Sequence, residues 1–201
     1  MNDTETLEAG LVLAGFDALR QIEGGAVLRA IMDQALLPAL ADAQSQASRV
    51  PIVDYLRYRD AALSYLGESF HAVAFEAGRT LVRNLRHRRL EEMEALIARF
   101  RDADGPLPLI GQAAVLAARG NPGVVRAEMP EAERLRIVIE KCPECRDLQR
   151  GTPFCFLNQG IITEFAQRHL GEAVATRETA CMAQGAPACT IEVTLTSSSA
   201  A

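Results

Sequence analysis

Several residue types are scarce in this 201-residue chain, and each scarcity narrows what the protein can be. There is no tryptophan and aromatic residues make up only 5%, so the core must be built mainly from Ala, Leu, Val and Ile. No apolar run reaches the roughly 18 residues that a membrane-spanning helix needs. The N-terminus, MNDTETLEAG, lacks the basic and apolar parts of a secretory signal. We therefore expect a soluble, cytoplasmic protein with no membrane span.

Charge and motif content exclude further classes. Lys141 is the only lysine and the net charge is −5, which argues against a nucleic-acid partner. We find no Gly-rich phosphate loop, no dinucleotide fingerprint and no Ser/His/Asp set, so the case for an enzyme is weak. Apolar residues nevertheless make up 49%, which is enough for a sizeable core.

The first 120 residues show mainly helical patterns. Apolar positions at helical spacing predict helices over 7–22, 26–47 with an interruption at Pro38, 52–85 with joints at Gly67 and Gly78, 89–100 and 110–120. Between them, 48–51 (SRVP) is expected to be a break and 102–109 (DADGPLPL) a loop.

After the GNPG breaker at 120–123 the pattern changes to short strands. Alternating residues predict strands at 124–129, 134–140, 173–178 and 189–195, with one helix at 155–170. The order strand-strand-helix-strand-strand predicts an α+β fold, with a helical N-terminal half packed on a small antiparallel sheet. We expect one domain over 1–195, helical in 1–120 with the sheet and metal site in 121–195, and a disordered tail at 196–201.

All five cysteines lie in the last third of the chain, and thiols of a cytoplasmic protein stay reduced. Cys155 opens the predicted helix, Glu178 and Cys181 end one strand, and Cys189 opens the last. The turn MAQGAPA must reverse the chain, which brings Cys181 and Cys189 together. Three thiolates and one carboxylate suit a closed, structural zinc site. The alternative is that these cysteines are small buried apolar residues.

A second pair, Cys142 and Cys145, forms a Cys-x-x-Cys motif at the end of a predicted strand. One interpretation is a redox pair, although no long helix follows the first cysteine, as a thioredoxin-type site requires. A second is an additional metal site or an iron–sulfur cluster that includes other thiols. A third is that the pair lies near the metal without binding it.

The stretch PFCFLNQGIITEF…GEAVATRETACMAQGAPACTIEV resembles the 4-vinyl-reductase domain family over roughly residues 120–195. The family pattern is a cysteine opening a helix with a glycine soon after, and then Glu-Thr-x-Cys-x-x-x-Gly-x-x-x-Cys. This sequence has the matching residues at Cys155, Gly160, Glu178, Thr179, Cys181, Gly185 and Cys189.

The resemblance implies zinc, bound by the residues that match those of the family's aromatic-sensing regulators: Cys155, Glu178, Cys181 and Cys189. Other relatives are hydrocarbon-binding proteins and a protein linked to bacteriochlorophyll synthesis, and the fold is shared with haem-based nitric-oxide sensors. The regulators continue into ATPase and DNA-binding regions, whereas this sequence ends. The resemblance thus implies a homodimer or a protein partner, and, if there is a reaction, reduction of a vinyl tetrapyrrole.

We therefore expect a metal-stabilised protein that binds a small apolar ligand and acts as a sensor or carrier. The ligand is an aromatic, hydrocarbon or tetrapyrrole-like molecule. The alternatives are an accessory protein or reductase of (bacterio)chlorophyll synthesis, and an iron–sulfur or thiol redox sensor. Four residues of the 52–85 region are candidates for the ligand pocket: Tyr65, Phe70, His71 and Phe75.

Overall fold

The computed structural model describes residues 5–37, 49–84, 106–118, 123–171 and 174–196, together with Ala95 and Ala98. The helix expected at 89–100 lies outside the described residues apart from those two alanines. So does the expected tail, apart from Thr196.

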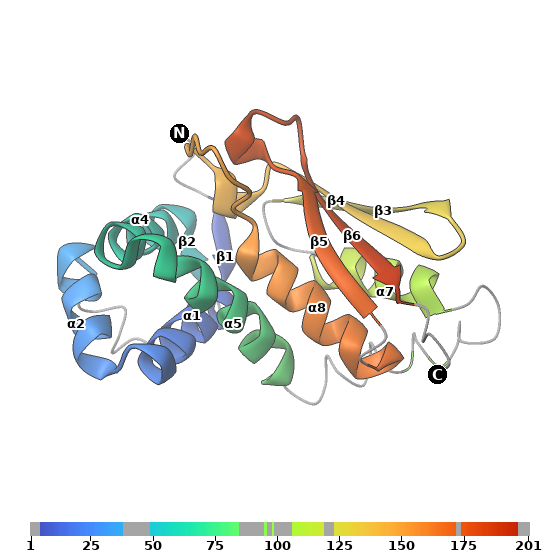
Figure 1. The fold of residues 1–201 in the computed structure, drawn as a ribbon. Coiled ribbons are helices and arrows are strands. Elements are labelled where there is room, and N and C mark those ends of the chain that lie inside the picture. The colour runs from blue at the N-terminus through green and yellow to red at the C-terminus, as the bar shows by residue number, and fades with distance from the viewer. Residues whose placement is uncertain are drawn as a thin grey trace.

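Helices dominate the N-terminal half, as the sequence predicts. Its helices are α1 (Ala9–Ile22), α2 (Gly25–Gln34), α4 (Ile52–Leu66) and α5 (Phe70–Arg83), with a single 3-10 turn, η2 (Gly67–Ser69), between the last two. Two three-residue strands, β1 (Thr6–Glu8) and β2 (Arg49–Pro51), pair antiparallel and hold the ends of this half together. In Figure 1 these elements, coloured blue to green, form one side of the molecule.

The C-terminal half is a four-stranded antiparallel sheet with the order β3-β4-β6-β5. Its strands are β3 (Val124–Glu131), β4 (Arg134–Glu140), β5 (Val174–Ala180) and β6 (Cys189–Leu195), and α8 (Phe156–Leu170) connects β4 to β5. The α+β class and the strand-strand-helix-strand-strand order are therefore confirmed. Two 3-10 turns, η3 (Pro143–Cys145) and η4 (Met182–Gln184), lie at the cysteine-bearing end.

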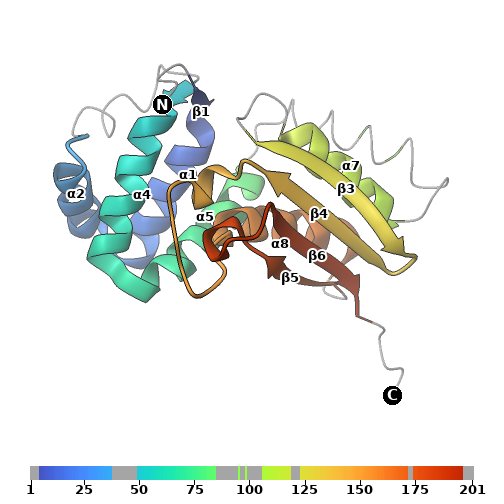
Figure 2. The same cartoon turned by 90° about the horizontal axis from the view of Figure 1, so that it is seen from above.

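One face of the sheet is covered by α8 and by α7 (Pro106–Ala117), as Figure 2 shows. The alternation of the strands decides which side chains point inward. Leu135 and Ile137 of β4 and Ile191 and Val193 of β6 are almost completely buried on this face. The core thus lies between the sheet and the two helices and continues into the helical half.

Helices α5 and α8 contact each other through their backbones. A Cβ atom at Gly78 would lie 2.7 Å from the backbone nitrogen of Ile161, and a Cβ at Gly160 would lie 2.9 Å from the carbonyl carbon of Phe75. Because only glycine permits this approach, α8 lies directly between α5 and the sheet. The joint expected at Gly78 is therefore wrong, since α5 runs through it and uses the missing side chain for packing.

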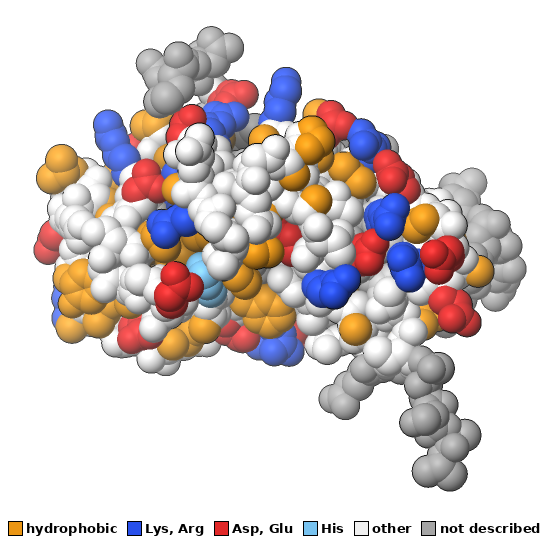
Figure 3. Space-filling model, turned by 45° about the horizontal axis from the view of Figure 1, so that its top comes forward, with side chains coloured by type: hydrophobic (Ala, Val, Ile, Leu, Met, Phe, Trp, Pro, Cys, Tyr) orange, Lys and Arg blue, Asp and Glu red, His pale blue; other side chains and the backbone are white. Residues whose placement is uncertain are grey.

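The outer face of the sheet is polar. Arg126 pairs with Glu128 at 2.9 Å and also with Glu140, and Arg136 pairs with Glu192 at 2.8 Å. Figure 3 shows basic and acidic side chains interspersed over this part of the molecule. Charged residues on β3 also suit its position at the edge of the sheet, where they discourage pairing with another strand.

Three local predictions need correction. Residues 49–51, expected to be a break, form β2, because they pair with residues 6–8, which are distant in sequence. The helix expected from residue 7 therefore starts at Ala9. Residues 106–109, expected to be part of a loop, are the first turn of α7, where proline is well tolerated. The joint at Gly67 is confirmed, since this residue has φ +57° and ends α4.

Among the described residues, no helix combines the length and the apolar character required to cross a membrane.

Candidate metal centre and adjoining cavity

The five cysteines gather at one end of the sheet, where it meets the helical half. Cys155 is the residue before α8, Cys181 follows β5 and Cys189 opens β6, while Cys142 and Cys145 lie on the turn after β4. All five are buried and none forms a disulfide. Segments that are far apart in sequence therefore bring their thiols to one place.

A β-bulge turns Glu178 and Cys181 to the same side of the sheet. Positions three apart on a regular strand face opposite sides. The pairing of β5 with β6 shifts between Glu178 and Ala180, which adds one residue to β5. As a result Glu178 and Cys181 both point inward and are 8% and 1% exposed. This bulge assembles the carboxylate and the thiol that the sequence motif predicted.

The turn between Cys181 and Cys189 is held by its own backbone. The amides of Gln184 and Ala186 both donate to the carbonyl oxygen of Cys181, at 3.0 and 3.1 Å. Gly185 takes the left-handed conformation, with φ +90°, which a glycine adopts at little cost. The backbone amide of Met182 donates to Sγ of Cys189 at 3.3 Å.

Glu178 has one oxygen satisfied and one without a partner. Oε2 accepts a hydrogen bond from the backbone amide of Cys155 at 2.9 Å, whereas Oε1 is buried with no hydrogen-bond partner in the described structure. Burial raises the pKa of Glu178 to about 8. A buried acceptor left unpaired costs about 1–3 kcal/mol, and more if it is charged, so a cation at this oxygen would remove a real penalty.

The donor atoms of Cys155, Glu178, Cys181 and Cys189 all lie within 4.8 Å of one another. This is the set predicted from the sequence. A second set, which uses Cys142 and Cys145 with Cys155 and Cys189, meets the same limit. The sequence left open whether the Cys-x-x-Cys pair joins the other thiols, and the fold places it in contact with them.

The thiols differ in acidity. Hydrogen bonds from Cys145 and then Cys155 lower the pKa of Cys181 to about 6. Contact with Cys142 lowers the pKa of Cys189 and raises that of Cys155. Because the thiolate is the metal-binding form, the cluster presents thiolates at neutral pH and not five neutral thiols.

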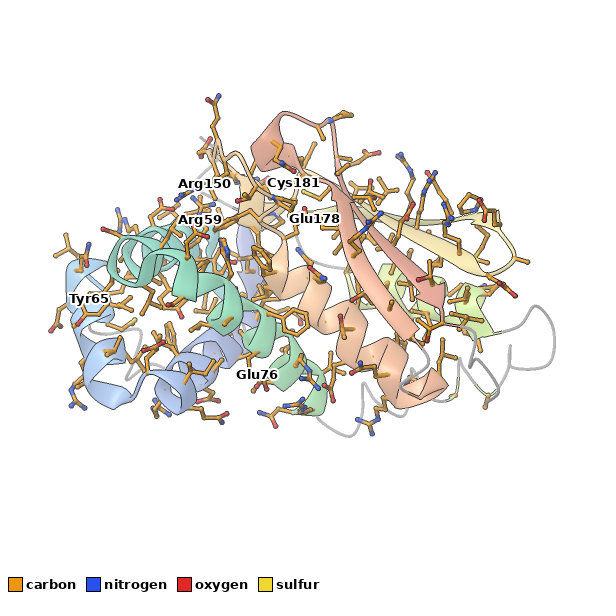
Figure 4. The ribbon with its side chains drawn as sticks, in the orientation of Figure 1. Arg59, Tyr65, Glu76, Arg150, Glu178 and Cys181 are labelled. Carbon is orange, nitrogen blue, oxygen red and sulfur yellow. The ribbon has the colours of Figure 1, made fainter. Side chains whose placement is uncertain are left out.

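The sequence analysis missed Arg59, a residue of α4 that is only 2% exposed. Its Nη1 donates to the carbonyl oxygens of Glu144 at 3.0 Å and of Arg146 at 2.8 Å. Its Nε and Nη2 pair with Asp60 at 2.8 and 2.7 Å. Figure 4 shows Arg59 and Arg150 on the side of the helical half that faces Glu178 and Cys181. Arg59 thus fastens the Cys-x-x-Cys turn to the helices.

Glu144, between the two cysteines of the pair, was also missed. Its Oε1 accepts from the backbone amide of Asn158 at 2.9 Å and its Oε2 from that of Leu157 at 3.1 Å. A carboxylate at these first-turn amides stabilises the start of α8. Burial raises the pKa of Glu144 to about 8. Its place inside the motif was a signal, but its contacts with α8 depend on the tertiary fold.

A cavity of about 130 Å³ adjoins the turn. It lies between the helices and the sheet, and its walls are mainly aliphatic side chains from β1, α1, α5, α7, β3, β4 and α8. Pro143 and Glu144 close one end, and Tyr55 and Asn158 add polar atoms there. The two residues between Cys142 and Cys145 therefore form part of the cavity wall.

Sequence comparison identifies the region that carries these features. Residues 135–195 match the model of the vinyl-4-reductase domain. This match confirms the resemblance to the 4-vinyl-reductase domain family, and it includes Glu178 and all five cysteines, but not Arg59. No protein of curated function matches the chain in sequence.

The fold also occurs in solved H-NOX proteins. The H-NOX protein from S. oneidensis in the Fe(II)NO ligation state has a TM-score of 0.61 at 13% identity, over 94% of this chain and 99% of that chain. The Fe(II) unliganded protein from K. algicida has a TM-score of 0.63 at 7% identity, over 94% and 96%. At such identities the likeness establishes a shared fold only, as expected from the resemblance.

The four residues predicted to line a pocket lie around the vinyl-4-reductase region in different ways. Phe70 stacks on Phe154, with ring centroids 5.8 Å apart, and lines a smaller cavity of about 20 Å³. His71 stacks on Phe156 at 4.2 Å and pairs with Glu68.

Neither His71 nor the other two candidates line either described cavity. Phe75 is half-buried and its backbone contacts Gly160. Tyr65 is 52% exposed and lies far from Cys181 in Figure 4. The cavity of about 130 Å³ is instead lined by aliphatic residues that had no individual signal in the sequence.

Proposed function

We propose that the chain is a metal-stabilised protein that binds a small aromatic or hydrocarbon molecule and acts as a sensor or carrier. The observation that carries this proposal is the apolar cavity whose end wall is the turn between Cys142 and Cys145. Through this wall a ligand in the cavity contacts the same segment that positions two thiols of the cluster. The match to the vinyl-4-reductase domain supports the same conclusion.

The metal in this proposal is zinc, bound by Cys155, Glu178, Cys181 and Cys189. The buried, unpartnered Oε1 of Glu178 and the spacing of the donors support it. Zinc–sulfur bonds of about 2.3 Å in a tetrahedron place neighbouring sulfurs about 3.8 Å apart. The nearest sulfur pairs of the cluster are 3.2–3.5 Å apart.

The same spacing favours a single ion over an iron–sulfur cluster. The core of a cluster lies between its cysteine ligands and holds their sulfurs farther apart than one ion does. Four protein donors leave no open position on zinc, so the metal supports the structure and does not activate water.

The size of the cavity favours a ligand with one ring. An engineered protein cavity of about 150 Å³ binds benzene, whereas a tetrapyrrole has four pyrrole rings. Haem iron is held by His, Cys, Met or Tyr. The described lining of this cavity contains Tyr55 but no His, Cys or Met. The iron of the H-NOX structures therefore does not carry over to this cavity.

Calorimetric titration with toluene and phenol, compared with a porphyrin, tests the proposed ligand class. We expect the single-ring compounds to bind and the porphyrin to bind at least tenfold more weakly. Ala114→Leu, which fills the cavity from α7, should weaken toluene binding at least tenfold. Gln112→Leu, on an exposed position of the same helix, is the matched control. Equal affinity in both variants, or no binding to wild type, would contradict the proposal.

The resemblance to the 4-vinyl-reductase domain family also leads us to propose a homodimer. Native mass spectrometry of the same sample measures the oligomeric state, together with any bound metal. A purely monomeric species at micromolar concentration would remove the dimer from the proposal and leave the ligand site unaffected.

A further inference from the structure

The turn that carries Cys142 and Cys145 places both thiols in the metal cluster without rearrangement. Sγ of Cys142 lies 3.2 Å from that of Cys155. Sγ of Cys145 lies 3.3 Å from that of Cys155 and 3.5 Å from those of Cys181 and Cys189. Cys145 is thus as close to the predicted ligands as a ligand would be.

These contacts create two sets of four donors that share Cys155 and Cys189. One set is completed by Glu178 and Cys181, the other by Cys142 and Cys145. The sets interpenetrate, because Cys145 of one set lies 3.5 Å from Cys181 of the other. Two separate cations would hold these unshared sulfurs farther apart, so the geometry suits one ion at a time.

The turn is held in place from three directions. Arg59 donates to the carbonyl oxygens on either side of Cys145. The carboxylate of Glu144 accepts from the first amides of α8. The backbone amide of Cys142 donates to Sδ of Met182 at 3.4 Å. Since these contacts involve no metal, the second donor set is built into the fold.

The two sets differ in softness and not in charge. Each offers four monoanionic donors, so the Coulomb attraction to a divalent ion does not choose between them. A carboxylate oxygen is a hard donor, whereas four thiolates suit a soft ion. Zinc accepts either set, but cadmium, its softer congener, favours sulfur throughout.

We propose that the cluster has an alternative all-thiolate shell, in which Cys142 and Cys145 replace Glu178 and Cys181 around a thiophilic divalent ion such as Cd²⁺. This inference rests on the proposed metal site, of which it is a second form. The protein binds one ion per chain in either form. The Cys-x-x-Cys pair is then a metal-binding element of the vinyl-4-reductase region and not a bystander.

X-ray absorption spectroscopy of the full reduced chain, loaded with Zn²⁺ or with Cd²⁺, counts the sulfur and oxygen donors directly. We expect three sulfurs and one oxygen around zinc and four sulfurs around cadmium. Cys142 and Glu178 each belong to only one set, so Cys142→Ser and Glu178→Gln form a matched pair. Cys142→Ser should convert the cadmium shell to three sulfurs and one oxygen, whereas Glu178→Gln should leave it at four sulfurs.

A wild-type cadmium shell with three sulfurs and one oxygen would overturn the inference and leave the proposed zinc site standing. Two cadmium ions per chain would also overturn it. Failure of wild type to bind either ion would overturn the inference together with the proposed zinc site. The comparison of the two wild-type forms decides the question even if a variant fails to fold, which circular dichroism would reveal.

Discussion

A single buried arginine connects the two halves of this protein. Arg59 comes from the helical half, yet its guanidinium is spent on the backbone of the Cys-x-x-Cys turn. Lys141 and Asp147, which bracket that turn, both have positive φ, at 53° and 58°. Non-glycine residues in this region cost about 1–3 kcal/mol each, so the turn needs outside support. Arg59 supplies it.

Replacement of Arg59 by Met should therefore destabilise the protein by about 3 kcal/mol or more, because it leaves buried carbonyl oxygens without donors. For a chain of this size, this corresponds to a fall in Tm of roughly 6–12 °C. Arg57→Met is the control, because Arg57 lies two residues away on α4 with its side chain 60% exposed. That change should stay within about 0.5 kcal/mol. Equal Tm values for the two variants would show that Arg59 does not hold the turn.

At the scale of elements, the contact between α5 and α8 sets the position of the metal centre. Cys155 is the N-terminal cap residue of α8, so any displacement of that helix moves one of the cluster's thiols. Gly78 and Gly160 let the two backbones touch. Ion pairs of Arg79 and Arg83 with Glu164, at 2.8 and 2.9 Å, hold the helices farther along. The helix pair is thus the frame on which the site is built.

Gly78→Ala should destabilise the protein by at least about 3 kcal/mol, because the new methyl group meets the backbone of α8, which cannot yield as a side chain can. Gly151→Ala is the comparison, since a Cβ atom there has no neighbour within 4 Å and φ is outside the left-handed region. We expect that change to be neutral. Denaturant unfolding of both variants measures the difference, and a neutral Gly78→Ala would refute the close contact.

At the scale of the whole molecule, the proposed metal is part of the folding energy, because its ligands come from three separate elements. The donors lie before α8, on and after β5 and at the start of β6. A bound ion therefore ties the last two strands to the helix that carries the cavity wall.

Removal of the metal should lower Tm. An ion present at 100 times its dissociation constant contributes about 2.7 kcal/mol, which corresponds to roughly 5–11 °C here. A chelator should produce this fall in wild type, and Cys181→Ser should show it without a chelator. Thr179→Ser, on an exposed neighbouring position of β5, should behave as wild type. Wild-type metal content and Tm in Cys181→Ser would falsify the structural role, and calorimetry with elemental analysis measures both.

Local sequence patterns determined the fold class and much of the site. Alternation in 134–140 and 189–195 and the breaker at 120–123 were enough to predict the sheet and its connecting helix, because inward and outward positions of a strand differ in polarity. The cysteine and glutamate spacing was enough to name one donor set. It did not locate β2, since pairing with residues 6–8 depends on a distant partner.

Only the tertiary structure decided the rest. The bulge at 178–180 turns two ligands to one side, the glycine contact sets α8, and Arg59 fixes the second pair of thiols. The cavity is likewise lined by aliphatic residues from many elements, none of which differs by type from an ordinary core residue. Chemistry-bearing residues can be recognised by their identity and spacing. A space between helices and a contact across 85 residues arise only from how the elements pack.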